Sequence, residues 1–124
     1  MEAHAISRHQ RVSARKIGRI LNLIREKDVP TALNTLKFLN KPTKRSVLKT
    51  LESAVANAVN KAGKAKLEEK DLVVAEARVN GGSMMKRWQA GPRGMGMQIR
   101  RRTAHVHITV KTKADFKATE TKRS

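Results

Sequence analysis

The side chains most suited to binding chemistry in this sequence are the arginines and lysines between Ala77 and Ala114. These 38 positions hold nine Lys or Arg residues and no Asp or Glu. A guanidinium group can donate hydrogen bonds to two phosphate oxygens at once or stack on a base, and a lysine adds a compact positive charge. Solvated loops usually mix both signs, so the exclusion of acids favours polyanion binding over a plain exposed loop. The candidate phosphate-binding residues of this stretch are Lys86, Arg87, Arg93, Arg100, Arg101 and Arg102.

Hydrophobic side chains are interleaved with these cations. Trp88 follows Lys86 and Arg87, and its indole ring would either stack on an unpaired base or cover the root of the segment. Methionine is flexible and polarisable, so it can pack within the segment or adapt to an irregular RNA surface. The methionines of this stretch are Met84, Met85, Met95 and Met97.

Two histidines, His105 and His107, stand two residues apart, which places both on one face of a strand. Such a pair can begin a metal site, but the chain has no Cys, and Asp115 and Glu120 lie in a polar tail. We therefore expect no metal site. Phosphate or base contacts, or plain exposure, are the expected roles of these histidines, and His105 is kept as a candidate RNA-binding residue.

No group of residues forms a catalytic motif. The acids stand singly or in a charged turn at residues 64–71, and no nucleophile is paired in motif with a base. Gly91, Gly94 and Gly96 precede an Arg-rich strand rather than opening a helix, which does not match the context of a phosphate-binding loop. We expect neither an enzyme nor a cofactor.

The composition indicates the class of partner. The chain of 124 residues has the size of one domain, and 28 Lys and Arg against 10 Asp and Glu give a formal charge of +18. Such an excess destabilises a compact monomer unless a polyanion neutralises it, which favours a nucleic-acid partner. No apolar run approaches the ~20 residues that span a bilayer, so we expect no membrane partner. The absence of Cys fits a reducing cytoplasm.

Three helices are predicted from apolar residues at i, i+3, i+4 and i+7. This pattern indicates a helix over residues 14–26 and another over residues 43–62 that ends at Gly63. Pro30 suits the first turn of a shorter helix that reaches about Phe38. The first helix and the residue before it carry a second set of candidate RNA-binding cations, namely Arg11, Arg15, Lys16 and Arg19.

Strand periodicity follows the third helix. Apolar and polar residues alternate over residues 105–110, and residues 1–12 suit an extended segment. Residues 72–79 predict a further strand, and the side chains expected to share its buried face are Val73, Ala75, Ala77 and Val79.

The basic stretch between these strands predicts a two-stranded ribbon. It covers about residues 79–108, and the Gly-Pro pair with two further glycines places its tip at residues 91–96. An arm of about 13 residues would reach on the order of 40 Å, against a radius of gyration of ~14 Å for the body. We expect a single RNA-binding domain over residues 1–113 and a flexible basic tail over residues 114–124, disordered when free.

Several stretches, taken in order from about residue 3 to residue 112, resemble one known family. The runs that carry the resemblance are Val-Ser-Ala-Arg-Lys-Ile at 12–17, Leu-Glu-Ser-Ala-Val-Ala-Asn-Ala at 51–58, Lys-Arg at 86–87, Pro-Arg at 92–93 and Arg-Thr-Ala-His-Val at 102–106. Together they resemble bacterial large-subunit ribosomal proteins of the L22 family.

The resemblance implies an α+β fold, with three helices packed on a small three-stranded antiparallel sheet and a long protruding β-hairpin. Members of the family bind large-subunit ribosomal RNA during early assembly, beside neighbouring ribosomal proteins, in the cytoplasmic ribosome. The hairpin tip helps line the nascent-peptide exit tunnel, and no homo-oligomer is expected. Carried onto this sequence, the tip residues are Gly91, Pro92, Arg93, Gly94, Met95 and Gly96. The implied RNA-binding residues are Arg11, Arg15, Lys16, Arg19, Lys86, Arg87, Trp88, Arg93, Arg100, Arg101, Arg102 and His105.

The hairpin departs from the family pattern at its tip. Met97 stands where the family usually has a basic residue. Seven residues, at 98–104, separate Met97 from His105, where the family usually has nine. The resemblance therefore predicts a hairpin that is two residues shorter.

The main alternative is an architectural DNA- or RNA-binding protein outside the ribosome. A basic ribbon with Pro at its tip also suits insertion into a minor groove. Proteins that bend DNA in this way are usually dimers, however, and no dimerising face is evident in the sequence. The alternatives differ in substrate, since an architectural protein accepts any duplex and a ribosomal protein prefers a folded RNA.

Overall fold

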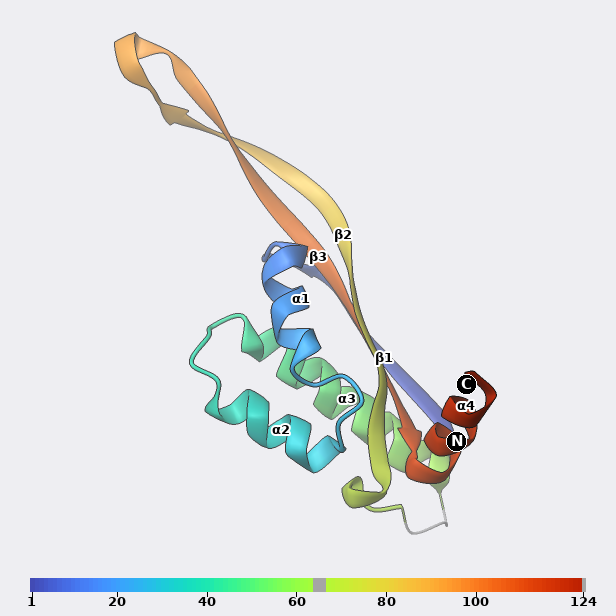
Figure 1. The fold of residues 1–124 in the computed structure, drawn as a ribbon. Coiled ribbons are helices and arrows are strands. Elements are labelled where there is room, and N and C mark those ends of the chain that lie inside the picture. Colours follow the sequence, from blue (N-terminus) through green and yellow to red (C-terminus); the bar gives the residue numbers. More distant parts are fainter. Residues whose placement is uncertain (64–66, 124) are drawn as a thin grey trace.

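Three strands form one antiparallel sheet in the computed structural model, which describes residues 1–63 and 67–123. The strands are β1 (Glu2–Gln10), β2 (Leu72–Ala90) and β3 (Gly96–Thr112). Their order in the sheet is β1–β3–β2, so β3 is the central strand and pairs with both neighbours (Figure 1). The prediction of an α+β fold with a three-stranded antiparallel sheet is confirmed.

Three helices cover one face of this sheet, as Figure 1 shows. They are α1 (Ala14–Asn22), α2 (Val29–Phe38) and α3 (Lys44–Ala62). The predicted second and third helices agree with α2 and α3, and Gly63 ends α3 with a φ of +56°. The first helix is shorter than expected because the chain after it pairs with β2. The N–H of Glu26 donates to the Val74 carbonyl, and the N–H of Val74 donates to the Lys27 carbonyl.

The core lies between the helices and the sheet and is almost wholly aliphatic. α3 crosses β1 and β3, and its small residues Ala54 and Ala58 are buried where it does so. Helical spacing places the buried side chains of each helix on one stripe toward the sheet. The largest fully buried side chains are Ile17, Leu21, Ile24, Leu36, Leu51, Leu72, Ile108, Val29, Val47, Val74, Val106 and Val110.

The buried face of β2 differs from the one predicted by simple alternation. The pairing of β2 with β3 shifts between Val74 and Glu76, which indicates a β-bulge. A bulge inserts one residue and reverses the facing of those that follow. Val74 and Ala77 therefore lie in the core, Ala75 stays partly exposed, and Val73 is buried outside the core cluster.

The prediction of three helices is wrong, because a fourth helix, α4 (Lys113–Arg123), follows β3. It begins directly at the end of the strand, where the Thr112 hydroxyl donates to Asp115 at 2.6 Å. α4 occupies the segment for which we expected disorder, and its mobility in the free protein stays a prediction. In the charged turn expected at residues 64–71, residues 64–66 lie outside the described residues, and Glu69–Asp71 form the 3-10 turn η1.

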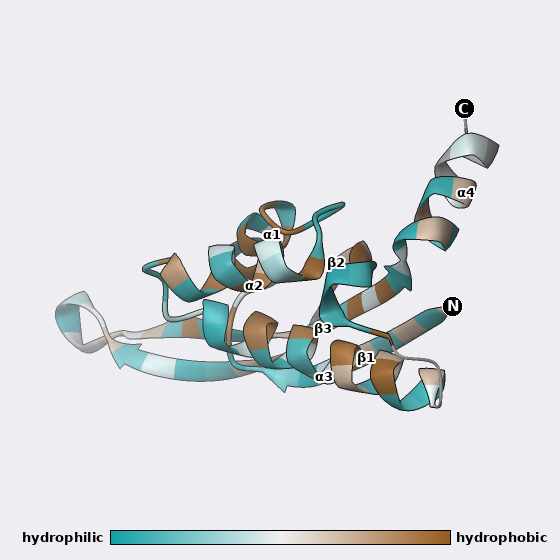
Figure 2. Ribbon diagram, turned by 90° about the horizontal axis from the view of Figure 1, so that it is seen from below, coloured by the Kyte–Doolittle hydropathy of each residue, from teal (hydrophilic) through white to brown (hydrophobic). Residues whose placement is uncertain are grey.

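β2 and β3 continue together past the helices as a ribbon. After a second irregularity between Gly81 and Met84, residues 84–90 pair with residues 96–102. This distal ribbon has seven residues per arm and reaches about 23 Å, because part of each predicted arm belongs to the sheet of the body. Figure 2 shows hydrophobic residues on the helices and the sheet beneath them, whereas the distal ribbon is largely hydrophilic.

Candidate nucleic-acid interface

Cations from both predicted sets meet at the root of the ribbon. One open hollow is lined by Arg11 and Lys16 from the body and by the three consecutive arginines of β3. The two sets are about ninety residues apart in the sequence, and the sheet brings them together because Gln10 of β1 pairs beside Ala104 of β3. The full lining of this root groove is Arg11, Val12, Ser13, Lys16, Thr43, Met85, Arg100, Arg101 and Arg102.

The start of α1 also lines a second hollow, which shares Ser13 and Arg102 with this groove. Arg15 and Arg102 lie there, together with Gly81 and Gly82 of β2. Arg19 lies one helical turn beyond Arg15 on the same exposed side of α1. The four cations predicted on and before α1 are all exposed, so they extend the basic surface from the ribbon onto the body.

Two cations that sequence reasoning missed adjoin the root groove. Arg45 and Lys49 line a further hollow that shares Arg11 and Thr43 with the groove. They stand at i and i+4 on α3, and that spacing was the signal, since it places both on one exposed face of a helix. The basic surface thus crosses from β3 through α1 to the start of α3.

The distal ribbon carries cations on both of its faces. Residues directly opposite each other in the ladder share a face, and successive residues alternate. Lys86 lies opposite Arg100, and Met84 lies opposite Arg102, on one face. Arg87 and Arg101 lie on the other face, opposite Ile99 and Met85. A ribbon that is basic on both faces suits a position between RNA segments rather than on the surface of one.

Electrostatic repulsion within the ribbon also favours an anionic partner. Lys86 and Arg100 are both exposed, and like charges directly across a ladder are destabilising. None of the ion pairs among the described residues includes a cation of the distal ribbon or the root groove. Those pairs are Met1–Asp115, Arg78–Glu76, Lys111–Glu2 and Lys113–Asp28. A phosphate between Lys86 and Arg100 would offset their repulsion.

The tip is a tight turn that requires glycine. The 3-10 turn η2 (Pro92–Gly94) contains positive φ angles at Arg93 (57°) and Gly94 (72°). The N–H of Gly91 donates to the Met95 carbonyl at 2.6 Å. A Cβ on Gly91 would lie 2.8 Å from that same oxygen. The predicted tip at residues 91–96 therefore corresponds to an ordered turn, with Arg93 exposed at its end.

Trp88 lies close to this tip rather than at the root of the ribbon. It pairs across the ladder with Gln98, and its Cε3 atom is 3.5 Å from the position of a Cβ on Gly96. The ring is 72% exposed. Met95 and Met97 near the tip are 70% and 57% exposed, but Met97 pairs with Gln89 and therefore lies on the other face of the ribbon. The exposed indole leaves a surface on which a base can stack.

His105 and His107 lie on the sheet face opposite the helices. The Nδ1 atom of His105 accepts the N–H of His9 at 3.0 Å, and the two rings meet edge to face at 4.8 Å. Burial lowers the pKa of His107, and the nearby charges of Arg78, His105 and Arg8 lower it further against an opposing effect of Glu76. No cluster of three metal-ligating side chains occurs among the residues that the structure describes.

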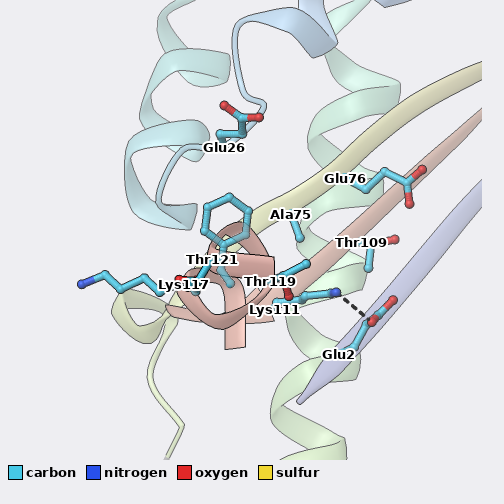
Figure 3. A pocket seen from close by; sticks show the side chains of 10 residues that line it. Glu2, Glu26, Ala75, Glu76, Thr109, Lys111, Lys117, Thr119 and Thr121 are labelled. Atoms are coloured by element: carbon cyan, nitrogen blue, oxygen red, sulfur yellow. Dashed lines mark hydrogen bonds and ion pairs between the residues drawn. The ribbon is translucent and has the colours of Figure 1, made fainter. Parts of the chain in front are cut away.

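A wider hollow lies between α4 and the far end of the sheet, away from the ribbon (Figure 3). Its lining includes Glu2, Glu26 and Glu76, and Figure 3 shows Glu2 paired with Lys111. Carboxylates repel phosphates, so this hollow does not belong to the basic surface. Across residues 1–63 and 67–123, no helix has both the length and the apolar character needed to cross a membrane.

A small α+β body with a basic arm and an acid-free groove defines a nucleic-acid-binding class of protein, to which many ribosomal proteins belong. Comparison with known proteins names the family. Residues 5–111 match the family model described as ribosomal protein L22p/L17e, and the chain belongs to this family. Its members are structural components of the ribosome and not enzymes.

Curated relatives agree with this assignment over nearly their whole length. The large ribosomal subunit protein uL22 of Bifidobacterium animalis subsp. lactis is 43% identical over 115 residues, which cover 91% of this chain and 97% of that protein. The protein of the same name from Thermoanaerobacter sp. (strain X514) is 45% identical, with 91% and 99% covered. The one from Clostridium novyi is 41% identical, with 92% and 100% covered.

Proposed function

We propose that this chain is a structural constituent of the large ribosomal subunit in the cytoplasm, where it binds large-subunit ribosomal RNA. The root groove carries the proposal, because Arg11 and Lys16 of the body lie there beside the arginines of β3. Groups that lie far apart in sequence but line one groove can hold one phosphate backbone along its length. Family membership and the names of the relatives support the same conclusion.

Within this proposal the ribbon is the part that enters the RNA. Both of its faces carry cations, and a ribbon of two strands is only marginally stable in water. RNA on both sides would neutralise these charges and hold the strands together, which supports early assembly of the subunit. The proposed RNA-binding residues are Arg11, Arg15, Lys16, Arg19, Lys86, Arg87, Trp88, Arg93, Arg100, Arg101, Arg102 and His105, with Arg45 and Lys49 added by the structure.

The ordered tip at residues 91–96 is the part that would help line the nascent-peptide exit tunnel. Its exposed Met95, together with the exposed Met97 that follows the tip, would contact the nascent peptide there, since methionine adapts to changing apolar surfaces. The RNA-binding domain spans residues 1–113. In the subunit it lies beside neighbouring ribosomal proteins, and it does not form a homo-oligomer. The basic tail at residues 114–124 is flexible in the free protein; it holds all of α4 except Lys113, and residue 124 lies outside the described residues.

Sedimentation tests this function directly. Native cells are lysed, ribosomal subunits are separated on a density gradient at moderate salt, and each fraction is probed for this chain. We expect one copy per large subunit, retained through the gradient. Recovery with chromosomal DNA or at the top of the gradient would contradict the proposal and favour the architectural alternative.

A matched pair of variants assigns the interaction to the ribbon. Replacing Lys86, Arg87, Arg100, Arg101 and Arg102 with Gln should shift the chain from the large subunit to the top of the gradient. Replacing five cations away from the ribbon and the root groove removes the same charge and should leave sedimentation unchanged. That control set is Lys27, Lys37, Lys61, Lys70 and Lys117.

A further inference from the structure

The sheet face opposite α1, α2 and α3 is a second ordered surface that the root groove and the ribbon do not use. Strand register places its side chains in rows that run across β1, β3 and β2. One row is Ile6–His107–Arg78, and the row beside it contains His105 and Asn80. Their neighbours along each strand, such as Ala5, Val106 and Ala104, are buried in the core on the other face.

Charge divides this face into two halves. The rows Glu2–Lys111 and His4–Thr109–Glu76 lie next to α4, which lines a hollow with them. The rows toward the ribbon contain no acid, and α4 leaves them uncovered. We call this second half the histidine face, and its residues are Ile6, Arg8, His9, Arg78, Asn80, His105 and His107.

The side chains of the histidine face suit unpaired bases. The backbone positions of His105 and His107 are about 7 Å apart along β3. The ring of His9 lies against that of His105. Ile6 is 43% exposed directly beside His107, so an apolar surface adjoins the imidazoles. Flat rings with adjacent apolar surface stack on splayed-out bases, which is how proteins commonly recognise single-stranded RNA.

Two arginines flank these rings. Arg8 and Arg78 are exposed, and both are close enough to His107 to oppose its protonation. Burial lowers the pKa of His107 most, and the positive field of Arg78 and Arg8, which lowers it further, also attracts a phosphate. Arg78 is paired with Glu76 at 3.5 Å, in a contact that is more than half exposed and therefore weak.

We propose that the histidine face binds an unpaired segment of RNA, with bases stacked on His105 and His107 and phosphates held by Arg8 and Arg78. This inference rests on the proposed function in that the partner is RNA, but it assigns a separate surface on the far side of the sheet. Double-stranded RNA is excluded as the occupant because its bases are stacked internally and cannot lie on the imidazoles.

Protonation couples to this binding in a defined direction. A phosphate near His107 favours the imidazolium form, so RNA raises the pKa of His107. Arg78, His105, Arg8 and Glu76 are the charged or titratable groups that face it. By linkage, affinity at this face rises as pH falls through the pKa of His107.

Imidazole NMR of the full chain tests the proposal, because all four histidines of the protein lie on this sheet face. The probe is a single-stranded RNA of about 12 nucleotides, and a duplex of equal length is the comparison. We expect the signals of His105 and His107 to shift with the single strand and the pKa of His107 to rise. His4, in the acidic half, should not shift. Equal shifts with the duplex, or no shift at His105 and His107, would overturn the proposal.

Two variants separate this face from the ribbon. Arg8→Gln with Arg78→Gln should abolish the shifts at His105 and His107 and lower the salt slope of binding by about 1.4, since each phosphate contact to a single strand contributes ~0.7. Lys27→Gln with Lys70→Gln removes the same charge and should change neither the imidazole shifts nor the salt slope. The ribbon variant with five Gln substitutions should keep the imidazole shifts even though it no longer sediments with the large subunit. If that variant loses the shifts as well, the histidine face is not an independent site.

Discussion

Whether a position in this protein tolerates a larger side chain depends on the atoms that lie within a few ångströms of it. Gly81 and Gly82 are adjacent on β2, but only the second is crowded. A Cβ on Gly82 would lie 2.4 Å from the Thr103 hydroxyl oxygen, whereas nothing lies within 4 Å of one on Gly81. The Thr103 hydroxyl is itself committed, because it donates to the Ser83 carbonyl at 2.6 Å.

Gly82→Ala should therefore destabilise the fold, whereas Gly81→Ala should not. The added methyl displaces the buried Thr103 side chain and breaks its hydrogen bond, at a cost of about 1–2 kcal/mol in the free energy of unfolding. Gly81→Ala should stay within about 0.5 kcal/mol of the parent. Urea unfolding measures both, and equal effects of the two variants would show that Thr103 does not limit the space at Gly82.

His107 should make stability depend on pH. Burial and the neighbouring cations lower its pKa in the folded state below the ordinary 6.5, so the unfolded chain binds the proton more readily. The stability associated with neutral His107 is fully present above the pKa of the unfolded state. It is lost as pH falls from that pKa through the lower pKa of the folded state. Unfolding in urea at about pH 7.5 and about pH 5.5 should show a smaller pH effect in His107→Gln than in the parent. An unchanged pH effect would exclude His107 as its source.

At the scale of elements, α3 supports the whole body. It spans 19 residues, and its side chains reach both β1 and β3. The Asn57 side chain donates to the His4 carbonyl at 3.1 Å, which ties α3 to the edge strand β1. Ala54 and Ala58 are small and buried, and they let the helix axis approach the sheet closely.

Enlarging the buried side of α3 should separate it from the sheet. Ala54→Leu adds three carbon atoms to a filled site and should cost about 1–3 kcal/mol in the free energy of unfolding. Ala56→Leu makes the same change on the exposed side of α3 and should remain within about 0.5 kcal/mol of the parent. Thermal unfolding compares them, and a neutral Ala54→Leu would mean that the core there has room to spare.

At the scale of the whole molecule, charge is distributed along the long axis. The cations of the ribbon and the root groove have no acidic partner among the residues that the structure describes, whereas Glu2, Glu26 and Glu76 gather beside α4 at the other end. This polarity orients the chain in the field of a polyanion, so the ribbon end approaches first.

Binding of the free protein to RNA should therefore be strongly salt-dependent. If about six phosphates are neutralised, the logarithm of the association constant should fall with the logarithm of salt concentration at a slope near −4 to −5. Fluorescence anisotropy over a salt series measures this slope. A nearly flat dependence would show that phosphate contacts do not dominate.

The sequence by itself determined the class of partner, because net charge and the exclusion of acids from residues 77–114 are properties of composition. It also located α2, α3 and the turn at residues 91–96, since helical spacing, Pro30, Gly63 and the Gly-Pro pair act over a few residues. Only the tertiary structure decided the end of α1, which depends on backbone pairing between Glu26 and Val74. The same holds for the bulge that changed the buried face of β2, and for α4. The root groove and the histidine face are likewise tertiary, because each is assembled by strand pairing between β1 and β3, whose paired residues there lie about 90 to 100 positions apart in the sequence.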